Sequence, residues 1–170
     1  MEPVRAKEDK REKTCCFTGH RAIPEAQFHR IEKKLEKTLI KLIEQGVIYY
    51  GAGGALGFDT MAAKTVLKLR VRFPQIKLIL VLPCKSQADR WSEADKITYQ
   101  EIMAQADKVV YTSEHYFGGC MHKRNRHLVD ASSVCVSYLT EEKGGTAYTV
   151  EYAKENGLRV INIAELGWLW

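Results

Sequence analysis

Glycines gather at two points of the sequence where a phosphate group could approach the main chain. The segment 51–59, GAGGALGFD, leads into a helix-like pattern, and Gly144 and Gly145 precede Thr146 at the start of another. A helix N-terminus presents unpaired N–H groups and a partial positive charge, and both favour an anion. Either segment alone is compatible with a tight turn that has no chemical role. Together they favour phosphate binding, with a predicted cradle of Gly53, Gly54, Gly57, Gly144, Gly145 and Thr146.

Basic and amide side chains lie in two further polar segments. Arg21, in the tripeptide 19–21, could bind a phosphate through its guanidinium or form a surface ion pair. The segment HKRNRH, 122–127, is either a solvated basic helix face or a ligand-facing one, because residues three and four apart share a face. We favour the second interpretation. The predicted contacts are Gly19, His20, Arg21, Asn125 and Arg126, with His20 alternatively bonded to a backbone carbonyl.

Two carboxylates are candidates for acid–base chemistry or for binding a ribose. Asp59 is predicted as the N-cap of a helix, as a partner for a ribose hydroxyl, or as both. Glu151 lies in the helix that follows GGT and faces either the ligand or solvent. They are the tentative catalytic residues of any hydrolytic reaction. Trp91 is expected to pack in the core, with base stacking as the alternative. Tyr116 and Phe117 are expected to be exposed in a loop, where they could stack an aromatic base.

Alternating strand and helix patterns predict how these residues are positioned. The apolar runs are continuous, which is typical of parallel strands buried on both faces. The sequence therefore predicts an α/β fold, Rossmann-like and doubly wound, with a mostly parallel sheet flanked by helices. The polar segments follow strand ends, so we expect them at one edge of the sheet. Predicted strands are 14–19, 47–51, 77–84, 108–113, 133–139 and 159–163; predicted helices are 31–46, 59–71, 88–106, 121–132 and 146–157.

Composition sets broader limits on the class of protein. The chain has 170 residues, a net charge of +5 and 45% hydrophobic residues. We expect a charged N-terminal arm at 1–13 and a single domain at 14–170. The five cysteines show no CxxC spacing, so we do not predict a metal site. Their odd number favours reduced thiols, so we predict a cytoplasmic location. No apolar run is long enough for a membrane span, and no P-loop motif is present.

The order and spacing of several motifs resemble the SLOG superfamily, and specifically its YpsA-like branch. They are CFTGHR (16–21), GGALGFD (53–59), RW (90–91), CMHKRN (120–125) with Arg126, VD (129–130) and GGT (144–146). The resemblance implies a Rossmann-like fold and a nucleotide-type ligand. The superfamily also includes LOG phosphoribohydrolases, which carry a PGGxGTxxE motif, and DprA, which binds single-stranded DNA. Here the matching segment is KGGTAYTVE, without the proline and one glycine, and Glu151 follows Thr146 by five residues instead of three.

These observations give one leading hypothesis and two alternatives. The leading hypothesis is a cytoplasmic sensor or regulatory domain that binds an ADP-ribose- or NAD-like nucleotide or a nucleoside phosphate. The first alternative is a nucleotide N-glycosidase, resembling the phosphoribohydrolases. The second is single-stranded DNA binding, which the modest net charge disfavours. Association into a homodimer is expected by analogy with other small α/β domains.

Overall fold

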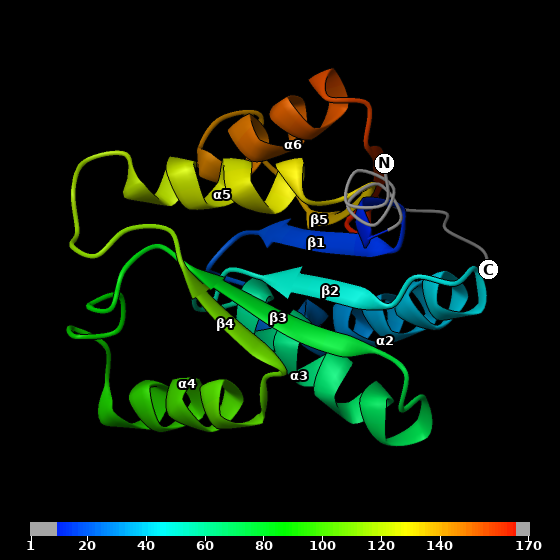
Figure 1. Cartoon of the computed structure of the whole chain (residues 1–170), viewed down its shortest axis with the longest axis horizontal. Helices are drawn as coiled ribbons and strands as arrows, with labels where there is room; N and C mark the ends of the chain where they lie inside the picture. Colours follow the sequence, from blue (N-terminus) through cyan, green and yellow to red (C-terminus); the bar gives the residue numbers. More distant parts are fainter. Residues whose placement is uncertain (1–9, 166–170) are drawn as a thin grey trace, which may run out of the picture.

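A computed structural model describes residues 10–165 of the chain (Figure 1). Its six strands pair in parallel throughout and form one sheet, in the order β4-β3-β2-β1-β5-β6. The strands are β1 (Thr14–Gly19), β2 (Tyr49–Ala52), β3 (Lys77–Leu82), β4 (Lys108–Tyr111), β5 (Val134–Tyr138) and β6 (Arg159–Asn162). The predicted Rossmann-like α/β fold is confirmed, and the sheet is entirely parallel.

Helices lie on both faces of the sheet, as the continuous apolar strands predicted. They are α2 (Glu25–Glu44), α3 (Phe58–Arg72), α4 (Glu93–Gln105), α5 (Cys120–Asp130) and α6 (Gly145–Glu155). In Figure 1, α5 and α6 cover one face, above β1 and β5, while α2 and α3 lie behind the sheet on the other.

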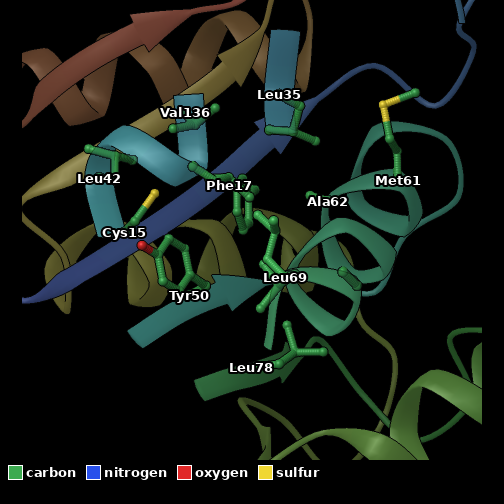
Figure 2. Packing of buried hydrophobic residues seen from close by; sticks show 14 of the residues in the cluster. Cys15, Phe17, Leu35, Leu42, Tyr50, Met61, Ala62, Leu69, Leu78 and Val136 are labelled. Atoms are coloured by element: carbon green, nitrogen blue, oxygen red, sulfur yellow. The ribbon is translucent and has the colours of Figure 1, made fainter. Parts of the chain in front are cut away.

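The core separates into two clusters because strand side chains alternate between the two faces. Cys15, Phe17 and Tyr50 point toward α2 and α3, and the rings of Phe17 and Tyr50 stack at 6.3 Å between centroids (Figure 2). Cys16 and Cys135 belong to the cluster under α5 and α6. All five cysteines of the chain are buried free thiols.

Two helix starts differ by more than one residue from the sequence predictions, and one predicted N-cap is wrong. α2 begins at Glu25, not at residue 31, because residues 25–30 are all exposed and so show no buried apolar period. α4 begins at Glu93, not at 88, because Ser92 caps it by accepting a hydrogen bond from the Asp95 N–H at 3.2 Å. The prediction of Asp59 as an N-cap is wrong: α3 starts at Phe58, after Gly57.

Two terminal predictions lie partly outside the described residues. Positions 1–9 of the predicted arm and 166–170 at the end of the predicted domain are not among them. Within residues 10–165, no helix combines the length and the apolar character that a bilayer span requires.

Candidate anion-binding site

A cavity of about 250 Å³ opens where the strand order reverses, at the carboxyl ends of β1 and β5. Ligands of open α/β sheets bind at such switch points, because two loops diverge there and leave a crevice. The lining brings together segments that follow β1, β2, β4 and β5. It includes eight residues named from the sequence: Gly19, His20, Arg21, Asp59, Asn125, Gly144, Gly145 and Thr146.

The N-terminus of α6 forms one wall of this cavity. Gly144 is its N-cap residue, with φ of +110°, and no side chain caps the helix. A Cβ atom on Gly144 or Gly145 would meet nothing within 4 Å, so the backbone here is open to a ligand. Lys143 and Arg21 are exposed and line the same cavity. This wall therefore presents uncapped N–H groups between two cationic side chains.

A buried carboxylate and a buried guanidinium form another wall. Asp59 is 7% exposed and Arg124 is 4% exposed. Arg124 donates to the Gly53 carbonyl oxygen and, at 2.7 Å, to Asn125 Oδ1, while Asp59 Oδ2 accepts from the Ala55 N–H at 3.3 Å. Burial raises the pKa of Asp59 and lowers that of Arg124, and the opposite charge of the other group only partly offsets each shift. Arg124 therefore directs its hydrogen bonds to groups of the protein.

The glycines between β2 and α3 have a structural explanation. A Cβ on Gly53 would lie 2.6 Å from Arg124 Cζ and 2.8 Å from Asp59 Oδ2. Gly57 has φ of +77° and packs directly on the backbone of Arg21. These glycines let the loop approach Arg124 and the segment after β1. Gly53, Gly54 and Gly57 are not part of the cavity lining, so their proposed contact with phosphate has no geometric support.

His20 connects three of the loops around the cavity. Its Nε2 accepts a hydrogen bond from the Thr140 N–H at 2.9 Å, and its ring lies edge-on to Tyr138 at 5.7 Å. Its carbonyl oxygen accepts from the Phe58 N–H at 3.1 Å. An accepting Nε2 requires the proton on Nδ1 in the neutral ring. His20 therefore fixes the loop after β1 against the loop after β5 and the start of α3.

Two other predicted residues lie away from the cavity lining. Arg126 is half-buried on α5, and Glu151 is exposed on α6. The two tentative catalytic carboxylates, Asp59 and Glu151, therefore do not share this cavity. Across residues 10–165, no three His, Cys, Asp or Glu side chains are arranged to hold a metal ion.

Three charged residues of the lining were not predicted from the sequence: Arg124, Glu141 and Lys143. Arg124 was grouped with a basic helix face. Arg124 lies four residues from Cys120 and four from Leu128, which are both buried, so it lies on the buried face of α5. This spacing is the feature of the sequence from which its burial could have been predicted. Glu141 and Lys143 immediately precede the GGT segment, but surface charges next to a glycine turn carry no distinguishing pattern.

Comparison with known proteins identifies relatives along most of the chain. A family model described as the YspA SLOG family matches residues 15–163. A UPF0398 protein from Halalkalibacterium halodurans is 31% identical over 173 residues, covering 92% of each chain. A UPF0398 protein from Bacillus cereus is 32% identical over 130 residues, covering 75% of this chain and 71% of that one.

Two solved structures share the fold at 20% sequence identity. DNA processing protein A (DprA) from Streptococcus pneumoniae superposes with a TM-score of 0.65, covering 88% of this chain and 49% of that one. DprA from Helicobacter pylori, described for its single-stranded DNA binding mode, gives 0.64 and covers 91% of this chain and 66% of that one. The chain thus spans about half of the first DprA and just under two thirds of the second.

Proposed function

This chain belongs to the YspA SLOG family, and we propose on that premise that its switch-point cavity binds the phosphate portion of a nucleotide-derived small molecule. The ligand would be of the ADP-ribose, NAD or nucleoside-phosphate type, and the protein would act as a sensor or regulatory domain. The observation that carries the proposal is the uncapped N-terminus of α6, which faces a cavity also lined by Arg21 and Lys143.

The charge balance of the lining supports an anionic ligand. Three cationic side chains, Arg21, Arg124 and Lys143, face two carboxylates, Asp59 and Glu141. Arg124 is buried and donates to the Gly53 carbonyl oxygen and to Asn125, so Arg21 and the helix terminus are the groups best placed to contact phosphate oxygens. The Asp59 carboxylate also borders the cavity, where it can accept a hydrogen bond from a ribose hydroxyl.

The test is calorimetric titration with ADP-ribose, NAD and AMP. We expect micromolar binding that Arg21→Ala weakens about 10- to 100-fold, because a hydrogen bond to a charged group contributes about 1.5–3 kcal/mol. Lys123→Ala is the matched control, since Lys123 is exposed and lies outside the lining. Absence of binding by all three nucleotides, or equal effects of the two substitutions, would contradict the proposal.

Hydrolysis of an N-glycosidic bond is a second candidate, favoured by one observation. Asp59 borders an open cavity and has a pKa raised by burial, which suits a general acid. A chromatographic assay should then detect free base from a nucleoside monophosphate, and Asp59→Asn should abolish it. Glu151→Gln is the control, because Glu151 lies outside the cavity lining. Absence of free base with the unsubstituted protein would eliminate this candidate.

Single-stranded DNA binding is a third candidate, suggested by the fold shared with H. pylori DprA. Exposed Tyr116 and Phe117 could stack on bases near Lys123. Affinity for an oligonucleotide should then fall steeply with salt and depend on Lys123. An affinity that changes little with salt would argue against it.

A further inference from the structure

A second cavity, of about 460 Å³, adjoins the first. It lies between the segment joining β3 to α4 and the segment joining β4 to α5, both on the left of Figure 1. Its lining includes Gln87, Arg90, Trp91 and Tyr116. Met121, in the first turn of α5, lines both cavities, so the two are neighbours across one side chain.

We propose that this second cavity binds the aromatic base of the nucleotide whose phosphate occupies the first. This inference rests on the proposed function and specifies the ligand further. The two cavities differ in chemistry as the phosphate and the base of a nucleotide do. The first presents a helix terminus and cations, and the second presents two aromatic side chains from different segments.

Size supports a ligand that occupies both cavities. Small-molecule sites in proteins are usually about 300–1,000 Å³. The first cavity, at about 250 Å³, lies below that range by itself. It can hold phosphate and ribose, and a third, aromatic part of the ligand requires the adjoining space.

Trp91 is held in place as a stacking surface. Its ring packs edge-on against Tyr99, with 5.2 Å between centroids and 79° between planes. Tyr99 packs on the hydrophobic core, and its hydroxyl accepts a hydrogen bond from Gln87 Nε2 at 3.3 Å. Trp91 itself is only half-buried. A base can therefore stack on an aromatic ring whose orientation is already fixed, which suits any base because every base has a π-face.

Gln87 provides a polar group for the base. Its Nε2 also donates to the Gly53 carbonyl oxygen at 3.4 Å, which links this cavity to the loop beside Arg124. Its Oε1 is buried and receives no hydrogen bond from the described residues. Buried acceptors are normally paired, so this one lacks a donor. Rotation of the Gln87 amide toward the cavity would bring Oε1 to an exocyclic amino group or a ring N–H of the base, which would supply that donor.

The experiment compares AMP with ribose 5-phosphate, which lacks the base. Trp91→Leu should weaken AMP binding about 5- to 150-fold, the range for losing one base–aromatic stack. Trp91→Leu should change the affinity for ribose 5-phosphate by no more than about 2-fold. If that affinity is weak, it can be measured by competition. Tyr116→Ala should also weaken AMP selectively, whereas Phe117→Ala should not, because Phe117 is a neighbouring exposed aromatic outside the lining.

Fluorescence gives a second readout that does not depend on replacing Trp91. In a Trp168→Phe/Trp170→Phe background, Trp91 is the remaining tryptophan of the three. AMP should change its emission, and ribose 5-phosphate should not.

Two negative outcomes can be distinguished. If Arg21→Ala weakens AMP binding but Trp91→Leu and Tyr116→Ala do not, the base subsite is refuted and the phosphate site stands. If ADP-ribose, NAD, AMP and ribose 5-phosphate all fail to bind, the phosphate site is refuted, and the base subsite with it.

Discussion

Replacing Arg124 with methionine tests whether the wall of the cavity depends on its buried charge. The side chain is 4% exposed and donates to the Gly53 carbonyl oxygen and to Asn125. Its loss leaves the Gly53 carbonyl without this donor and removes the positive charge that acts on buried Asp59. Leaving a buried polar group unpaired typically costs about 1–3 kcal/mol, and more for a charged group. The free energy of unfolding of a protein domain is typically about 5–15 kcal/mol, so we expect the variant to be less stable but still folded at pH 7.

Urea unfolding followed by circular dichroism measures this loss. Arg126→Met is the matched control on the same helix, and we expect it to change the free energy of unfolding by no more than about 0.5 kcal/mol. Adding Asp59→Asn to Arg124→Met should recover about 1 kcal/mol or more, because it removes the unpaired buried charge. A loss below about 1 kcal/mol for Arg124→Met, or no recovery in the double variant, would refute this reasoning.

Three further outcomes follow from the glycines and from Asp59. Gly53→Ala should reduce the free energy of unfolding by about 1–3 kcal/mol, because its Cβ would overlap Arg124 and Asp59, and unchanged urea unfolding would contradict this. Gly145→Ala should leave the free energy of unfolding unchanged or raise it by up to about 1 kcal/mol, because the added Cβ meets no protein atom. The same Cβ lies at the cavity and should weaken AMP binding in calorimetry, and an unaltered affinity would contradict this. Burial raises the folded-state pKa of Asp59 above its ordinary 3.8, so its contribution to stability is present below pH 3.8 and is lost as pH rises through the folded-state pKa. The difference in free energy of unfolding between the unsubstituted protein and Asp59→Asn should therefore decrease as pH rises from 3.8 through the folded-state pKa of Asp59. A difference that does not change with pH would contradict this.

The fold was predictable because its signals are local and repeated. Strands such as β5, whose five residues are all buried, read as continuous apolar runs, and helices alternate with them. Helix starts were less predictable. Residues 25–30 of α2 are all exposed, and none of residues 85–92 before α4 is buried, so neither boundary has a hydrophobic signal.

The candidate site was predictable to the level of its loops but not of its side chains. Parallel strands bring the segments after their carboxyl ends to one edge, which placed His20, Arg21 and Gly145 correctly at a shared cavity. A sequence does not show which backbone faces a ligand and which faces a neighbouring loop. Gly53 and Gly145 look alike in sequence, yet one contacts Arg124 and the other meets open space.

A crystal structure of the protein grown with ADP-ribose would show directly whether this cavity binds phosphate. We expect phosphate density within hydrogen-bonding distance of the N–H groups of Gly145 and Thr146, with Arg21 turned toward it. Phosphate bound instead against the glycines of the loop between β2 and α3, or a nucleotide bound elsewhere while this cavity stays empty, would contradict it.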